Sequence, residues 1–162
     1  MSDIQVIRRA VNEDLAGINK LLRQVLMVHH NGRPDLFKPN VKKYNDEELL
    51  GIIADDSRPV FVAVDGDNKV MGYAFCIFQV TDGDNVRTDM KTLYIDDLCV
   101  DESLRGKHIG KALYEYAVEF ARKNDCYNVT LNVWECNENA RRFYDSMGLK
   151  PYRTGMEFII QR

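Results

Sequence analysis

A chain of 162 residues is long enough to bury one hydrophobic core as a single domain over residues 1–162, without help from disulfides or metals. Its net charge of −3 at pH 7 argues against a general nucleic-acid-binding protein, which would carry a strongly basic face. The chain shows no apolar leader core and no apolar run near the ~20 residues that span a bilayer, so we expect a cytoplasmic protein that does not enter a membrane.

The first half of the chain predicts one strand, two helices and a hairpin. Residues 4–10 are β-branched and precede an amphipathic helix over 12–26, with Asn12 as its predicted cap. Gly32, Pro34 and Pro39 then predict a loop, and residues 45–56 predict a second helix with acids in its first turn. Residues 59–85 predict two strands joined by a tight turn at 65–68 and closed by a second turn at 82–85.

The second half alternates strands and helices. Strands are predicted over 90–100, 127–134 and 153–162, with helices over 103–123 and 137–148 between them. The helix between strands 93–100 and 127–134 favours a parallel crossover, whereas the hairpins favour antiparallel neighbours. The chain therefore predicts an α/β or mixed α+β domain. The four cysteines, Cys76, Cys99, Cys126 and Cys136, form no CxxC pair, so we expect reduced thiols and no metal site.

The predicted helix over 103–123 has cations at its N-terminal end, where positive charge is unfavourable. Arg105, Lys107 and Lys111 lie where the N–H groups of a helix start already carry partial positive charge, whereas the first two helices begin with acids. An anion such as a phosphate would remove this conflict, and the alternative is a solvated basic surface. The spacing Gly106 to Lys111 is one residue short of a P-loop, and the glycines do not fit a dinucleotide fingerprint.

Two segments resemble the GNAT superfamily of acyl-CoA-dependent N-acetyltransferases. Residues 105–110, "RGKHIG", match the family's cofactor motif R/Q-x-x-G-x-G/A, and residues 137–149, "NENARRFYDSMGL", match a second family segment. The resemblance implies a GNAT-like domain with a central, mixed, mostly antiparallel sheet, a splayed parallel strand pair and about four flanking helices. It also implies direct acetyl transfer from acetyl-CoA to a primary amine.

The resemblance implies a cofactor site on three segments. Backbone groups of one strand would pair with the pantetheine arm, the loop and helix start would hold the pyrophosphate, and the second motif would hold the arm from the other side. The residues concerned are Leu98, Cys99, Val100, Arg105, Gly106, Lys107, His108, Ile109, Gly110, Lys111, Asn137 and Asn139. His108 departs from the motif, because the family usually has glycine there. Its side chain could crowd the ligand, or it could act as a base.

Three residues are candidates for the chemistry. Tyr144 matches the tyrosine with which many members protonate the departing thiolate, although its helical stripe would also suit a core residue. Asp96 and Asp97 interrupt an apolar strand, and strand alternation predicts opposite faces, with Ile95, Asp97 and Cys99 together on one of them. Asp96 is the predicted base or amine-binding acid and Asp97 the reserve, while a purely structural carboxylate and a Cys99 nucleophile are alternatives.

The acceptor is predicted from weaker signals. "YIDDLCV" resembles the Y-L-E-D strand of diamine and polyamine acetyltransferases, where the acid matching Asp96 engages the amine. His29, His30 and Arg33 lie in the Pro-bounded loop and are candidate substrate-binding residues. The alternatives are a solvated loop and, for His29, a place on the apolar face of the first helix. A small amine or polyamine is the predicted acceptor. A peptide N-terminus and a non-catalytic CoA-binding module are the alternatives. Edge strands such as residues 156–160 could pair two copies into a homodimer.

Overall fold

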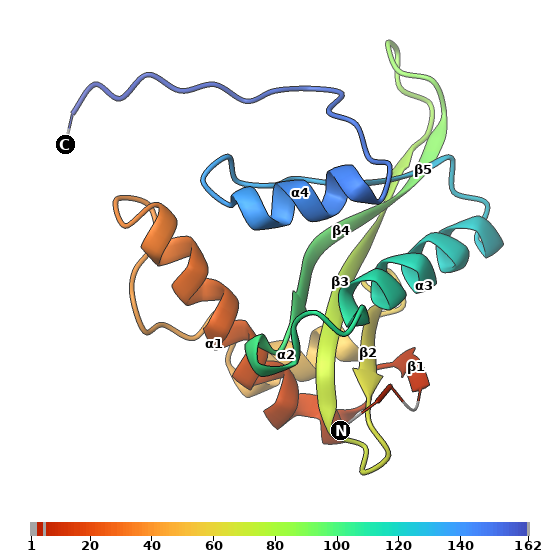
Figure 1. Cartoon of the computed structure of the whole chain (residues 1–162). Helices are drawn as coiled ribbons and strands as arrows, with labels where there is room; N and C mark the ends of the chain where they lie inside the picture. Colours follow the sequence, from red (N-terminus) through yellow and green to blue (C-terminus); the bar gives the residue numbers. More distant parts are fainter. Residues whose placement is uncertain (1–2, 5, 162) are drawn as a thin grey trace. The chain divides into compact units, whose positions relative to one another are not determined.

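The computed structural model describes residues 3–4 and 6–161 (Figure 1). The chain divides into two units, Met1–Asn132 and Val133–Arg162. The first unit holds the sheet and three of the helices that the described residues form, and the second holds one helix. No helix among the described residues is both long and apolar enough to cross a membrane.

The first unit is built on a five-stranded mixed sheet. The strands are β1 (Val6–Arg9), β2 (Val60–Val64), β3 (Val70–Thr81), β4 (Met90–Val100) and β5 (Asn128–Leu131), in the spatial order β1-β2-β3-β4-β5. The first three pairings are antiparallel, and β4 pairs with β5 in parallel. The predicted mixed sheet with one parallel pair is therefore confirmed.

Helices cover both faces of this sheet (Figure 1). α1 (Leu15–Gly32) and α2 (Asp46–Ile53) pack with residues such as Val62 and Tyr73 in one core cluster. α3 (Ile109–Lys123) packs on the opposite face, where Leu113 and Ala117 contact the sheet. Two short 3₁₀ turns, η1 (Asn12–Asp14) and η2 (Glu102–Leu104), precede α1 and α3. The sheet is thus sandwiched, and the loop entering α3 lies at one end of β4.

The first helix is longer than its sequence pattern indicates. α1 continues to Gly32, so His30 belongs to its last turn and not to the predicted loop, and His29 belongs to the helix, which was the alternative for this residue. Histidine side chains suit a helix C-terminus, where carbonyl groups carry partial negative charge. The second helix begins as predicted, with Asn45 accepting a hydrogen bond from the Glu48 N–H and Glu48 accepting one from the Asn45 N–H.

A β-bulge interrupts β4 at Asp96. Phe75 lies opposite Asp97, but the next residue of β3, Cys76, lies opposite Ile95, so Asp96 has no partner across the ladder. Ile95 consequently packs on the α3 face with Cys76, while Cys99 packs on the α1 face with Tyr73. The predicted grouping of Ile95 with Asp97 and Cys99 is wrong, because the extra residue resets the alternation of faces.

The second unit contains α4 (Glu138–Ser146) and extended chain. Asn137 caps α4 by accepting a hydrogen bond from the Ala140 N–H, and Gly148 ends it with φ +90°, as the sequence predicts. The predicted closing strand over 153–162 is wrong for the described residues 153–161, which join no β-ladder. A strand needs a neighbouring edge, and none of the five described strands pairs with this segment.

Candidate active site

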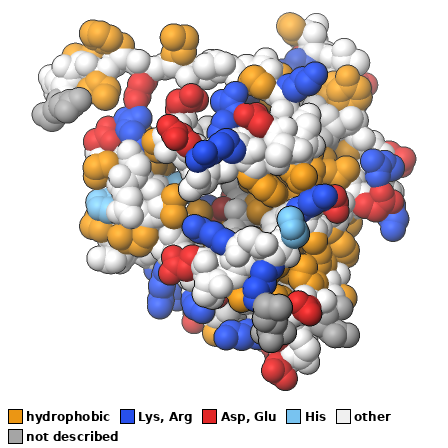
Figure 2. Space-filling model, viewed as in Figure 1, with side chains coloured by type: hydrophobic (Ala, Val, Ile, Leu, Met, Phe, Trp, Pro, Cys, Tyr) orange, Lys and Arg blue, Asp and Glu red, His pale blue; other side chains and the backbone are white. Residues whose placement is uncertain are grey.

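The loop entering α3 presents a row of free backbone donors. The first hydrogen bond of α3 runs from the Ala112 N–H to the His108 carbonyl, 3.1 Å, and the N–H groups of residues 106–111 donate to no described group. Arg105, Lys107 and Lys111 add positive charge along the same segment. Lys and Arg side chains lie over the start of α3 in the space-filling view (Figure 2). This combination suits a phosphate or pyrophosphate.

Two residues turn the chain into this shape by adopting left-handed backbone. Gly106 has φ +84°, and no atom lies within 4 Å of the position where a Cβ would stand. His108 has φ 61° and ψ 22°, and its side chain makes no capping hydrogen bond. The family's preference for glycine at this position therefore has a backbone reason, since a residue without Cβ adopts a positive φ at no steric cost.

Polar contacts between α1 and the buried Asp101 and its neighbours hold the loop in place. Asp101 accepts hydrogen bonds from Lys20 Nζ at 3.0 Å and from the Ser103 N–H and hydroxyl. Burial alone would raise the pKa of Asp101, but these bonds outweigh it and lower the pKa to about 2. Gln24 accepts a further bond from the Glu102 N–H. The loop is thereby anchored on its N-terminal side before α3 begins.

The other end of the loop is set by a close approach of α3 to β3. A Cβ on Gly72 would lie 2.9 Å from the Cys99 carbonyl oxygen and 2.9 Å from Leu113 Cδ1. Only glycine leaves room for the first turns of α3 to pack directly on the sheet. The row of donors is therefore held next to the end of β4.

The parallel pair opens beyond Ile95. The β4–β5 ladder ends at the pair Ile95↔Leu131, while β4 continues to Val100. The Asp101 N–H donates to the Met71 carbonyl at 2.9 Å, so the antiparallel alternation turns the backbone of Cys99 toward β3 and that of Leu98 and Val100 toward the open edge. The backbone N–H and C=O groups of Leu98 and Val100 can thus pair with an extended ligand, as predicted for a pantetheine arm. Those of Cys99 face β3 and cannot do so.

A charged cluster forms at the bulge, which we call the bulge cluster: Lys43, Asp96, Asp97 and Tyr73. Lys43 Nζ, from the segment between α1 and α2, lies 3.7 Å from Asp96 Oδ2. Burial alone would lower the pKa of Lys43, but Tyr44, Asp96 and Asp97 outweigh it and raise the pKa. Lys43 therefore stays charged, and it faces both aspartates because the bulge brings them to one side.

Asp97 is the more enclosed carboxylate of the two. Burial raises its pKa, and the Tyr73 hydroxyl donates a hydrogen bond to Asp97 Oδ2 at 2.7 Å. Tyr73 is fully buried, and burial and Asp97 raise its own pKa well above the usual value. Burial and Asp97 also raise the pKa of the Cys99 thiol to about 12. A thiol held protonated is a poor nucleophile, so the covalent alternative through Cys99 is disfavoured.

The predicted acceptor residues are only partly brought to this cluster. His29 is half-buried, and burial and then Lys43 lower its pKa, which keeps the ring neutral close to the bulge cluster. His30 contacts the Phe37 carbonyl oxygen through Nδ1 at 2.7 Å, and Arg33 pairs with Asp35. Of the predicted trio, His29 thus lies within electrostatic reach of Lys43.

Three predicted residues belong to the second unit. Asn137 caps α4, the Asn139 side chain accepts a hydrogen bond from Arg142, and Tyr144 packs edge-to-face on Phe143 with ring centroids 5.1 Å apart. Their predicted contacts with the cofactor and the leaving group stay predictions.

Sequence reasoning missed Lys43, Tyr73 and Asp101. Each is an ordinary residue in its local pattern, and its role comes from partners distant in the sequence. An acid next to another acid inside an apolar strand was the one available signal, because a buried carboxylate requires a partner somewhere. The described residues contain no group of three or more His, Cys, Asp or Glu side chains suited to a metal ion.

Comparisons with known proteins agree with this geometry. A model of the acetyltransferase (GNAT) family matches residues 26–149. An uncharacterized N-acetyltransferase from the pepI 3′ region of Lactobacillus delbrueckii subsp. lactis is 37% identical over 123 residues, which cover 75% of this chain and 69% of the relative.

Solved structures show the same fold. A point mutant of the BH1408 protein from Bacillus halodurans has a TM-score of 0.93 at 29% identity, covering 97% of this chain and 100% of that one. The aminoglycoside N-acetyltransferase AAC(6′)-Iy in complex with CoA has a TM-score of 0.71 at 16% identity, with 100% and 97% covered.

Proposed function

Because the chain belongs to the acetyltransferase (GNAT) family and is an acetyl-CoA-dependent N-acetyltransferase, we propose that it acetylates a small primary amine whose ammonium is held at Asp96. Family membership confirms the predicted fold class, enzyme class and cofactor and leaves the acceptor open. A small amine or polyamine remains the predicted acceptor, with a peptide N-terminus as the second candidate.

The observation that carries the proposal is the charge balance of the bulge cluster. Two carboxylates, Asp96 and Asp97, face one cation, Lys43, whose Nζ lies 3.7 Å from Asp96. One carboxylate therefore lacks a full counter-charge, and an ammonium group from an acceptor would supply it. Asp96 is the more exposed of the two aspartates, so it is the one an incoming ligand reaches.

Different residues would bind the cofactor, orient the amine and transfer the protons. Acetyl-CoA, when bound, supplies a thioester carbonyl that a neutral amine can attack. The N–H groups of residues 106–111 would hold the pyrophosphate, and the backbone of Leu98 and Val100 would orient the pantetheine arm. Asp96 Oδ2 would orient the amine and accept its proton, and Tyr144 Oη is the proposed proton donor for the leaving group.

An amine panel tests the proposal. Purified protein with acetyl-CoA and diamines, amino acids, aminoglycosides or short peptides should release free thiol. Asp96→Asn should raise KM for the acceptor about tenfold or more and leave CoA affinity unchanged. Asp82→Asn, an exposed carboxylate in the β3–β4 turn, serves as the matched control. Absence of thiol release with every amine, despite CoA binding, would overturn the proposal.

We also propose that the segment 156–160 pairs with a second copy of the chain. Met156, Phe158 and Ile160 alternate along it and are 94%, 89% and 86% exposed. Alternating, exposed apolar side chains along a segment outside the sheet are typical of a strand that lacks its neighbour. A homodimer would give these side chains a surface to pack on.

A further inference from the structure

A hollow of about 500 Å³ lies beside the bulge cluster. It is lined by Lys43, Tyr44, Glu48, Gly51, Ile52 and Arg58, from the segment before α2, from α2 itself and from the loop entering β2. The volume is within the usual range for small-molecule sites, about 300–1,000 Å³. Its lining combines an aromatic ring and an aliphatic side chain with three charged groups.

Lys43 belongs to both the hollow and the bulge cluster. Its ammonium forms the ion pair with Asp96 and lies 5.3 Å from the centre of the Tyr44 ring. Tyr44 in turn stacks on Phe75 of β3, 6.2 Å between centroids, which holds this wall against the sheet. A ligand in the hollow is therefore separated from Asp96 by no more than one side chain.

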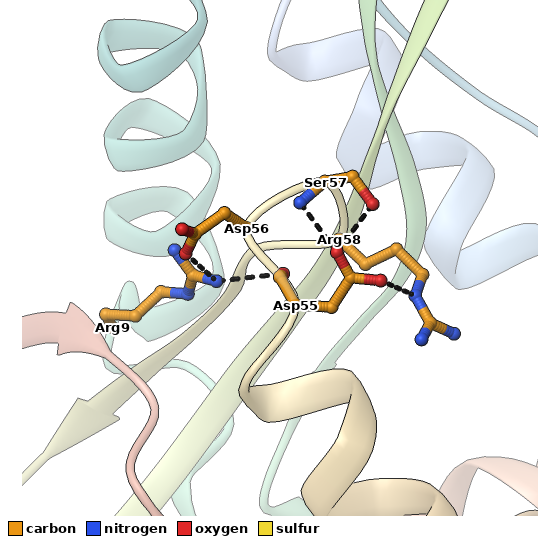
Figure 3. Close-up of polar contacts among 5 residues, drawn as sticks. All are labelled: Arg9, Asp55, Asp56, Ser57 and Arg58. Atoms are coloured by element: carbon orange, nitrogen blue, oxygen red, sulfur yellow. Dashed lines mark hydrogen bonds and ion pairs between the residues drawn. The ribbon is translucent and has the colours of Figure 1, made fainter.

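Arg58 presents unused donors to the hollow. Its Nε donates to Asp55 Oδ2 at 2.8 Å, and Asp55 is itself held by the N–H and hydroxyl of Ser57. Figure 3 shows the two terminal nitrogens of Arg58 pointing away from Asp55, on the opposite side of the loop from Arg9. These two nitrogens donate no hydrogen bond to any group of residues 3–4 and 6–161. A guanidinium with two parallel free donors matches a carboxylate or phosphate.

The charges of the lining favour an anion. Lys43 and Arg58 are positive, and Glu48 is the one acid among the lining residues. The Glu48 carboxylate already accepts the Asn45 N–H at 2.9 Å in the cap of α2. An oxyanion would thus meet two cations, each already paired with one aspartate, and one acid that is engaged in the cap of α2.

We propose that this hollow binds an oxyanion of the acceptor, a carboxylate or a phosphate that lies a few bonds from the amine. Arg58 holds the oxyanion through its two terminal nitrogens, and Lys43 bridges between the oxyanion and Asp96. The inference rests on the proposed function and narrows its acceptor, since it favours an amine with an acidic group over a plain diamine.

Two matched pairs of acceptors test the inference and separate the two anion types. Lysine and cadaverine differ by a carboxylate, and glucosamine 6-phosphate and glucosamine differ by a phosphate. We expect kcat/KM for at least one acidic member to exceed that of its partner by about tenfold or more, mainly through KM. Arg58→Gln should remove this preference and change the activity toward the partner without the anionic group by less than about twofold.

Arg122→Gln is the matched control, because Arg122 also pairs with an acid three residues earlier but lies on α3, away from the hollow. Calorimetric titration of the CoA-saturated protein with each acidic probe gives a readout that does not depend on turnover. The inference is overturned if kcat/KM for cadaverine and glucosamine equals or exceeds that of their acidic partners. It is also overturned if the preference survives Arg58→Gln, or if the acidic probes are neither bound nor turned over. Turnover of cadaverine and glucosamine alone would leave the proposed function standing. An Asp96→Asn variant with normal kinetics would contradict that function instead.

Discussion

Replacing His108 with glycine should stabilise the protein in the absence of cofactor. His108 adopts φ 61° and ψ 22°, a left-handed conformation that costs a residue with a Cβ roughly 1–2 kcal/mol. Glycine removes that cost, but it adds freedom to the unfolded chain, which offsets about 0.5–1 kcal/mol. The expected net gain is about 0.5–1 kcal/mol, or a rise in Tm of about 1–4 °C for a chain of this length.

Differential scanning calorimetry of the cofactor-free protein measures this gain. The control is Lys107→Gly in the same loop, because Lys107 is not among the described residues with positive φ. The control variant gains freedom in the unfolded state without losing strain in the folded state, so its Tm should fall. If His108→Gly lowers Tm as much as Lys107→Gly does, the strain assigned to His108 is refuted.

Cofactor affinity of the same variant tests whether the imidazole matters. The substitution keeps the backbone N–H of residue 108, and the His108 side chain makes no capping hydrogen bond. The Kd for CoA measured by calorimetry should therefore stay unchanged or decrease. A tenfold weakening, about 1.4 kcal/mol, would mean that the imidazole contacts the cofactor directly.

Three other residues, Tyr144, Asp101 and Phe158, give further tests. Tyr144→Phe should lower kcat on the order of 10²-fold with little change in the Kd for CoA, and unchanged kcat in a thiol-release assay would contradict its role as proton donor. The pKa of Asp101 is lowered to about 2, below its unfolded value, so its stabilisation is present above about pH 4 and lost as pH falls toward 2. Asp101→Asn should therefore cost about 1–2 kcal/mol in urea unfolding at pH 7, allowing for the exposed Lys20 partner, and a gap that persisted at pH 2 would contradict this account. Phe158→Asp should shift the mass measured by light scattering from dimer to monomer, and a wild-type monomer would exclude the pairing of residues 156–160.

The unusual loop entering α3 could be recognised from sequence because its signals are local. The cations at Arg105, Lys107 and Lys111 conflict with a helix start, and this conflict depends only on residues that follow one another in the chain. The start of α2 and the end of α4 were predictable for the same reason, since caps are set within one turn. The left-handed backbone of His108 was not predictable. The motif usually has glycine at this position, and a histidine in its place does not itself indicate a positive φ.

Elements whose existence depends on distant partners were predicted less well. The alternating residues of 153–162 have the composition of a strand, but composition supplies no neighbouring edge, and the described part of this segment joins no β-ladder. The last turns of α1 were missed because Gly32 and Pro34 indicate a loop, whereas the helix continues as far as Gly32 itself.

The bulge at Asp96 explains why two adjacent aspartates can serve one site. In a regular strand their side chains would point to opposite faces, and an argument from alternation would have to choose between Asp96 and Asp97. The extra residue in β4 brings both within electrostatic reach of Lys43, one more exposed and one bonded to the buried Tyr73. The two carboxylates therefore differ in environment but not in direction. In the proposed site, the exposed Asp96 would hold the acceptor amine beside Lys43, while the enclosed Asp97 stays bonded to the Tyr73 hydroxyl.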